Sequence, residues 1–172
     1  MLRLFRIKGN RMRILGLDPS LSSTGWGVIE VVNNRLRYVA DGFIKTNPKD
    51  ALPDRLAIIH RALNEVIELY KPDEAAIEQV FLNENPMSTI KLGMARGVVI
   101  LAPALFGLSV TEYEPTKVKK ALVGVGRAEK SQVETMVKVL LPGCKPKNND
   151  SSDALAIAIT HYNYRQSRRV GM

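Results

Sequence analysis

The sequence of 172 residues lacks several features that define whole classes of protein. Its one cysteine, Cys144, excludes an internal disulfide and a cysteine-rich zinc site. Aromatic residues make up only 6% of the chain. We find no signal-peptide pattern and no uninterrupted apolar run of the roughly 18 residues that a membrane helix needs. The sequence therefore predicts a cytoplasmic protein with no membrane segment.

Internal repeats and domain linkers are also absent from the sequence. At this length a chain can bury a core without disulfides or structural metals. We therefore expect one domain over residues 12–167, preceded by a basic N-terminal extension over residues 1–11. Met12 is an equally plausible start, and such a basic tail is commonly just solvated.

Acidic residues are scarce near both ends of the chain, whose net charge is +8. The first 13 residues carry five basic side chains and no acid, and the tail adds three arginines. Between residues 117 and 147, eight basic residues face only Glu129 and Glu134. A basic surface around a few isolated acids indicates a polyanionic partner handled at a metal site.

Hydrophobic patterning predicts an α/β protein. The run Ile14–Leu17 suits a strand buried on both faces, and Pro19 ends its ladder. Asn33 and Asn34 join two extended segments, which indicates an antiparallel hairpin. The helix over residues 54–70 joins two strands and predicts a parallel crossover. In chain order we expect strands over residues 14–18, 26–32, 36–45, 75–78 and 108–114, and helices over residues 54–70, 86–105, 116–122, 129–140 and 150–165.

Two acidic residues end predicted strands, and two more begin the last predicted helix. Asp18 follows the first strand and Glu78 ends the fourth, so a parallel crossover places them side by side at one edge of the sheet. Asp150 and Asp153 are three residues apart and can share one helix face. Simpler interpretations exist, because Asp-Pro often only initiates a turn and acids at a helix start often only cap it. Either of the two asparagines before Asp150 could cap that helix instead.

Together the four carboxylates match the ligands of divalent cations. Buried acids are costly unless they are paired or bound to a metal, and hard oxygen ligands suit Mg²⁺ near phosphates. Two such ions about 3.5–4 Å apart can activate water and stabilise the leaving oxygen in phosphodiester cleavage. The residues alone therefore favour metal-dependent cleavage of a nucleic acid.

Five stretches of the sequence share a pattern with a known family. They are residues 14–19 (ILGLDP), 76–81 (AIEQVF), 91–97 (KLGMARG), 123–133 (VGVGRAEKSQV) and 153–161 (DALAIAITH). In this order they closely resemble RuvC, the family of bacterial Holliday junction resolvases. The resemblance extends from Met12 to His161, and several blocks spread over a chain are far more specific than any one acid.

This resemblance implies an RNase H-like fold, in which helices flank a five-stranded mixed sheet. It implies a homodimer that makes paired, symmetric cuts across a four-way DNA junction in homologous recombination and repair. Two Mg²⁺ ions per subunit are expected, with Mn²⁺ as a substitute, and branch-migration proteins are expected as further partners. The catalytic and metal-binding acids of the family fall on Asp18, Glu78, Asp150 and Asp153.

The resemblance also assigns contacts to DNA. A base-stacking aromatic falls on Phe81 and two DNA-contacting lysines fall on Lys119 and Lys130, and we expect Lys130 to act on the scissile phosphate as well. Without the family, Phe81 would be interpreted as a core residue and the lysines as solvated charges. His161 is expected to be structural. Ser20 departs from the family, which usually has glycine there, and a turn that needs positive φ would fit serine poorly.

The predicted helix over residues 86–105 is apolar on more than one stripe and carries Gly93 and Gly97 four residues apart. Such a helix either fills a core or forms a subunit interface, and the dimeric family favours the interface. Two other functions stay open. One is an RNase H-like nuclease that acts on another substrate, such as an RNA–DNA hybrid. The other is a non-catalytic junction-binding protein, which needs basic residues but not four acids.

Overall fold

The computed structural model describes residues 11–80 and 85–170, and its elements follow the predicted order. The strands are β1 (Arg11–Asp18), β2 (Ser23–Val32), β3 (Arg35–Lys45), β4 (Glu74–Glu78) and β5 (Ser109–Tyr113). The helices are α1 (Leu52–Tyr70), α2 (Pro86–Leu105), α3 (Pro115–Val123), α4 (Lys130–Leu140) and α5 (Asn149–Val170). The expected basic extension, apart from Arg11, lies outside the described residues.

The five strands form one mixed sheet in the order β3-β2-β1-β4-β5. β1 is antiparallel to β2 and parallel to β4, while β3 extends the antiparallel side and β5 the parallel side. The predicted mixed sheet and the parallel crossover through α1 are both confirmed. At the β2–β3 turn, Asn33 and Asn34 have φ values of 50° and 60°, which is the left-handed geometry that a two-residue hairpin favours.

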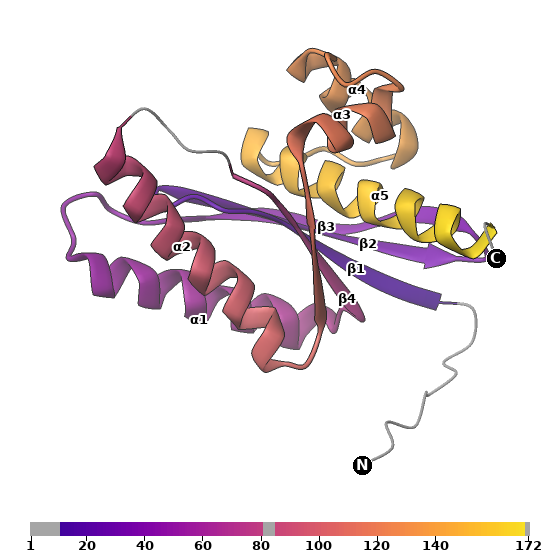
Figure 1. Ribbon diagram of the computed structural model, residues 1–172. Coiled ribbons are helices and arrows are strands. Elements are labelled where there is room, and N and C mark those ends of the chain that lie inside the picture. Colours follow the sequence, from indigo (N-terminus) through magenta and orange to yellow (C-terminus); the bar gives the residue numbers. More distant parts are fainter. Residues whose placement is uncertain (1–10, 81–84, 171–172) are drawn as a thin grey trace.

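Helices cover both faces of the sheet (Figure 1). α5 lies along one face with α3 and α4 beyond it, and α1 and α2 cover the other face. Successive residues of β1 alternate between the two cores: Ile14 packs on the α5 side, whereas Leu15 and Leu17 pack on the α1 side. Asp18 therefore faces α5, because it lies four residues after Ile14.

Glycines in β1 and β2 allow α5 to lie directly on the backbone of the sheet. A Cβ atom added to Gly16 would overlap the main-chain carbonyl of Ala154, and one added to Gly25 would overlap the main-chain carbonyl of Asp150. At Gly27 an added Cβ would lie 2.7 Å from the Leu155 side chain. The sheet and the first turns of α5 are thus in contact where the acidic residues begin.

α2 is anchored along one side only. The Asn85 side chain caps it by accepting hydrogen bonds from the backbone N–H groups of Met87 and Ser88, at 3.0 and 3.2 Å. Arg96 donates to Glu112 of β5 at 2.6 Å. The buried residues of α2 are Ala95, Val99, Ala102 and Pro103. The exposed apolar side chains of α2 include Met87, Ile90, Met94, Leu101 and Leu105.

By length and composition, α2 is also the one helix in the described part of the chain that is apolar enough to cross a membrane, with a hydropathy of 1.3. Lys91 and Arg96 divide this segment, so α2 does not stand out in the sequence as an uninterrupted apolar run. Only 22% of its apolar window is buried. This much exposed apolar surface on one helix indicates that something covers it.

We predict that Gly25→Ala lowers the free energy of unfolding by about 1–3 kcal/mol, because the new methyl group forces α5 away from β2. Gly126→Ala is the matched control, since its Cβ would meet nothing nearer than 3.6 Å and its φ is not positive. Denaturant unfolding followed by circular dichroism measures both. Equal stability of the two variants would contradict the close packing of α5.

Candidate active site

The carboxyl ends of β1 and β4 bring the first two acidic residues together. Leu17 pairs with Ile77 in the parallel register, so the next residues along, Asp18 and Glu78, end neighbouring strands at the same level. Ala76 packs in the core under α5, so Glu78 faces the same side as Asp18. The predicted pairing of these two acids at one sheet edge is confirmed.

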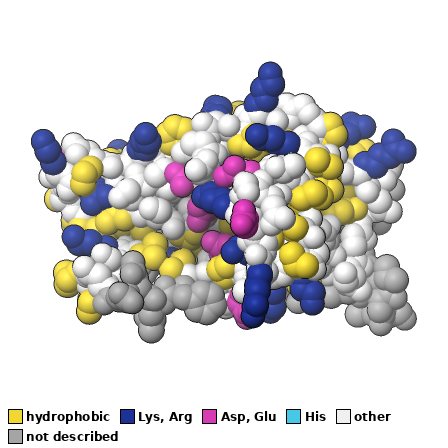
Figure 2. All heavy atoms as spheres, turned by 90° about the horizontal axis from the view of Figure 1, so that it is seen from above, with side chains coloured by type: hydrophobic (Ala, Val, Ile, Leu, Met, Phe, Trp, Pro, Cys, Tyr) yellow, Lys and Arg dark blue, Asp and Glu magenta, His cyan; other side chains and the backbone are white. Residues whose placement is uncertain are grey.

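Asp150 and Asp153 reach the same place from the first turns of α5. The contact of Gly25 with the Asp150 backbone holds that helix start over the end of β1. Electrostatic interactions join Asp18 to Glu78, Asp150 and Asp153. Figure 2 shows acidic and basic side chains gathered in the middle of the face seen from above.

Asn148 resolves the question of what caps α5. Its side-chain oxygen accepts a hydrogen bond from the backbone N–H of Ser151 at 2.9 Å, and its carbonyl accepts one from the Ser151 hydroxyl at 3.0 Å. Asn148 thus caps the start of α5, and neither Asp150 nor Asp153 is needed for this. Asp150 instead accepts hydrogen bonds from the Ser23 hydroxyl and from the Asn148 side chain, the latter at 3.1 Å. Capping therefore does not account for Asp150 and Asp153.

Crowding and burial make the charged forms of these acids unfavourable. Burial, then the neighbouring Asp153, Glu78 and Asp150 carboxylates, raise the pKa of Asp18 from 3.8 to about 8, while Lys130 acts in the opposite direction. Burial and Asp153 likewise raise the pKa of Glu78 to about 7, against Lys119 and Lys130. Burial also raises the pKa of Asp153. The cluster has more negative charge than its surroundings neutralise.

Two lysines stand beside the acids. Lys130 Nζ lies 2.9 Å from Asp153 Oδ2, and this hydrogen bond raises the pKa of the lysine. Lys119 interacts electrostatically with Glu78 and lines the same pocket as Lys130. Both predicted DNA-contacting lysines thus lie at the acidic cluster. Phe81, the predicted base-stacking residue, lies outside the described residues.

The donor set fits a divalent cation by its chemistry. Across residues 11–80 and 85–170, no three histidine, cysteine or acidic side chains are arranged closely enough to hold an ion as they stand. Four carboxylates from β1, β4 and α5 nevertheless share one sheet edge, where burial and then their mutual repulsion raise the pKa values of Asp18 and Glu78. A cation would relieve that repulsion, and carboxylate oxygens are the ligands that Mg²⁺ prefers.

The turn after Asp18 does not require glycine. Within the described residues, positive φ outside glycine occurs only at Asn33, Asn34 and Lys71. The condition under which Ser20 would fit this turn poorly, a positive φ, is therefore not met. The Ser20 hydroxyl oxygen accepts hydrogen bonds from the backbone N–H groups of the two residues after Leu21, at 3.3 and 3.4 Å.

Sequence reasoning missed the residues that hold the acids in place. It left residues 19–25 between two predicted strands, although β2 begins at Ser23, the Ser23 hydroxyl binds Asp150, and Gly25 allows α5 to approach. The available signal was the pair Gly25 and Gly27, two residues apart in the sequence. Residues at this spacing face the same side of a strand, so they indicate that another element packs closely on that side. His161 is buried, and its ring nitrogens lie 2.9 Å from Tyr113 Oη and 2.7 Å from Glu74 Oε2.

The five-stranded mixed sheet flanked by helices is the RNase H-like fold, and four carboxylates lie at one edge of it. The chain belongs to the RuvC family, whose model, described as crossover junction endodeoxyribonuclease RuvC, matches residues 14–161.

Relatives and solved structures agree with this assignment. A crossover junction endodeoxyribonuclease RuvC of Paramagnetospirillum magneticum is 55% identical over 92% of this chain and 95% of the relative. The Thermus thermophilus RuvC structure has a TM-score of 0.84 at 33% identity, covering 91% of this chain and 97% of that one. The same protein in complex with a Holliday junction substrate gives 0.85, also at 33% identity, over 91% and 96% of the two chains. The family is one of metal-dependent nucleases.

We predict that metal-free protein loses stability as the pH rises from about 4 to about 8. Because the pKa of Asp18 is raised in the fold, the folded chain keeps a proton that the unfolded chain releases over this range. Asp18→Asn removes the charge, so at pH 8 it should be more stable than the unchanged protein by about 1–3 kcal/mol. Unfolding at pH 5 and pH 8 in chelator measures the difference.

Asp50→Asn is the matched control, because Asp50 lies exposed in the loop before α1. It should leave the pH dependence unchanged. If the advantage of Asp18→Asn were the same at both pH values, the raised pKa would be refuted.

Proposed function

We propose that this chain is a structure-selective endonuclease that resolves four-way DNA (Holliday) junctions by paired, symmetric phosphodiester cleavage in recombination and repair. Membership of the RuvC family supports the reaction and the substrate. The observation that carries the proposal is the collection of four carboxylates from β1, β4 and α5 at one sheet edge, where burial and mutual repulsion raise the pKa of Asp18 to about 8.

The proposed ligands are Asp18, Glu78, Asp150 and Asp153, which would hold two Mg²⁺ ions per subunit, with Mn²⁺ able to replace them. When bound, such ions activate water and stabilise the leaving oxygen of the cut strand. The residues of this chain orient that site. Ser23 fixes one carboxylate of α5 through its hydroxyl, and the sheet fixes the acids of β1 and β4.

The proposed DNA contacts surround the acids. Lys119 and Lys130 supply positive charge for the phosphates, and Lys130, already within 2.9 Å of Asp153, is near enough to act on the scissile phosphate. Phe81 would stack on an unpaired base just after β4. These contacts put the basic residues of α3 and α4 on the DNA side of the molecule.

The proposed homodimer is formed through α2. A junction with near two-fold symmetry needs two opposed cuts, and a two-fold dimer supplies two identical sites. The buried residues of α2 pack toward α1, while its exposed apolar side chains face outward. Gly93 and Gly97 lie on this open surface with nothing within 4 Å of an added Cβ, so another helix can approach closely.

The remaining parts of the proposal follow from the family. The proposed nuclease domain spans residues 12–167, with residues 1–11 as a basic extension; β1 begins one residue earlier, at Arg11, and α5 continues to Val170. The protein acts in the cytoplasm, where bacterial DNA lies, with branch-migration proteins as partners, and the apolar surface of α2 meets its own copy instead of a membrane.

A substrate panel tests the function directly. Four-way junction, RNA–DNA hybrid and linear duplex are compared at fixed salt with Mg²⁺. We expect paired cuts in the junction and little cleavage of the others. Preferential cleavage of the hybrid would establish a different RNase H-like nuclease, and binding without cleavage would establish a non-catalytic junction-binding protein.

We predict that Asp18→Asn, Glu78→Gln, Asp150→Asn and Asp153→Asn each abolish junction cleavage but retain junction binding. Neutral side chains of the same shape remove a metal ligand but keep the packing of the fold. They also lessen the repulsion of DNA phosphates. Gel-shift and cleavage assays on the same samples measure both. A variant that cuts at nearly the unchanged rate in Mg²⁺ would remove its residue from the proposed ligands.

Lys119→Ala and Lys130→Ala should each weaken junction binding. Loss of one phosphate contact lowers the slope of log affinity against log salt by about one unit. Arg37→Ala is the control, because Arg37 is exposed near the β2–β3 hairpin at the far end of the sheet. For Lys130→Ala we expect the cleavage rate to stay low even at saturating enzyme. Slopes equal to that of the control would place both lysines off the DNA surface.

Gly97→Glu should give a folded monomer that nicks junctions weakly and singly, because a charge at the close approach prevents the two α2 helices from meeting. Sedimentation at micromolar concentration and circular dichroism measure assembly and folding. Thr135→Glu adds the same charge on α4 and should leave the dimer intact. An unchanged protein that sediments as a monomer yet makes paired cuts would rule out this dimer.

A further inference from the structure

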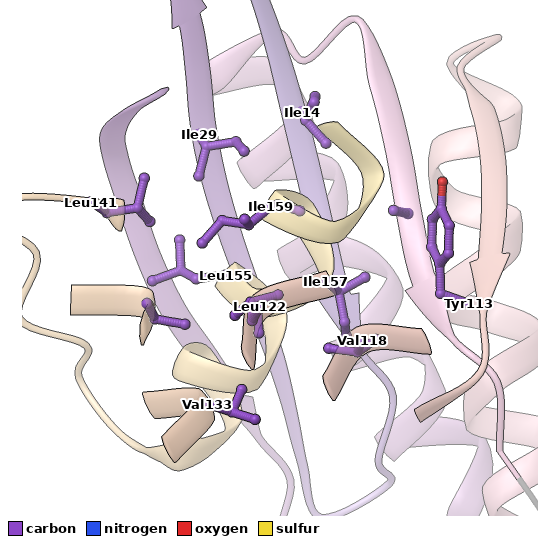
Figure 3. Packing of buried hydrophobic residues seen from close by; sticks show 14 of the residues in the cluster. Ile14, Ile29, Tyr113, Val118, Leu122, Val133, Leu141, Leu155, Ile157 and Ile159 are labelled. Atoms are coloured by element: carbon purple, nitrogen blue, oxygen red, sulfur yellow. The ribbon is translucent and has the colours of Figure 1, made fainter. Parts of the chain in front are cut away.

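A small pocket opens beside the acidic cluster, between the end of β4 and helices α3, α4 and α5. Its volume is about 210 Å³. Pro115 and Val118 of α3, Val133 of α4 and Ala156 of α5 supply its apolar walls. Figure 3 shows Val118 and Val133 on neighbouring helices that pack over α5. The reaction proposed above uses none of these four side chains.

Charged groups form the rest of the pocket. Glu78 and Asp153, two of the proposed ligands, lie on one part of the lining, and Lys119 and Lys130 lie on another. The scissile phosphate must therefore lie next to this pocket if the proposed site is correct. A DNA group that enters the pocket would therefore belong to a nucleotide adjacent to the cut.

The lining selects which part of that nucleotide enters. Phosphate is excluded from apolar walls by the cost of losing its water, and it is better placed at the lysines. A nucleobase has apolar faces and edge atoms that accept hydrogen bonds, and lysine ammonium groups can only donate them. We propose that this pocket receives one unstacked nucleobase next to the scissile phosphate, with Pro115 and the exposed edges of Val118 and Val133 against it.

Size and substrate geometry support this occupant. Pockets for drug-sized ligands usually measure about 300–1,000 Å³, so a pocket of about 210 Å³ suits a single flat ring system. Taking a base out of its stack is least costly where the duplex is already distorted, as at a branch point. The pocket would therefore strengthen binding of junction DNA more than binding of continuous duplex. The inference rests on the proposed function and assigns a base-binding subsite to it.

The test removes the base and the pocket separately. A set of junctions is made, each with one abasic nucleotide, placed at one of the positions within two nucleotides of the cut. Their cleavage by the unchanged protein is compared with their cleavage by Val133→Ala, which widens the pocket. We expect one abasic position to slow the unchanged protein about tenfold, by analogy with loss of one base contact. Val133→Ala should cut the intact and abasic junctions at rates within about twofold of each other.

Two further variants control for packing. Val137→Ala makes the same change one turn along α4, in the core and away from the pocket lining, so it should keep the full abasic penalty. Ala156→Val fills the pocket and should also abolish the penalty; if it does not fold, Val133→Ala still decides the question. An equal abasic penalty in Val133→Ala and the unchanged protein, or none at any position in the unchanged protein, would overturn the pocket. Failure of the unchanged protein to cut any intact junction would instead overturn the proposed function.

Discussion

Helix α5 lies so close to β1 and β2 that a methyl group at Gly16 or Gly25 would overlap its backbone. The position of the two acids of α5 relative to those of the sheet depends on this contact. It sets the height of Asp150 and Asp153 above the sheet, and so their distance from Asp18. Close packing of this kind transmits small changes, because protein interiors have few voids to absorb them. A change of a single methylene far from the acids can therefore alter the geometry between them.

The acidic cluster opposes the stability of the fold that positions it. Burial and mutual repulsion raise the pKa values of Asp18 and Glu78, and Lys119 and Lys130 offset only part of the repulsion. The cores on the two faces of the sheet must supply the compensating free energy. This arrangement is common where a protein reserves a place for positive charge, because the groups that hold a ligand repel one another without it.

The fold was largely predictable from the sequence because its signals are local and repeated. The buried run Ile14–Leu17 marked the central strand, and Asn33-Asn34 marked the hairpin that the structure contains. The pairing of Asp18 with Glu78 followed from one crossover. What sequence could not supply was contact between distant segments. Nothing local indicates that Ser23 binds Asp150, or that side chains from three helices line one pocket beside the acids.

The position of Lys130 at the first residue of α4 has an effect on that helix itself. Backbone N–H groups give a helix start a partial positive charge, so a cation there is unfavourable, and acids are preferred. Glu129 and Gln132 form a reciprocal cap at this point, and the carboxylate of Asp153, from another helix, neutralises the ammonium. The start of α4 is thus stabilised partly from outside. The ion pair with α5 offsets an unfavourable charge that α4 carries at its own first residue.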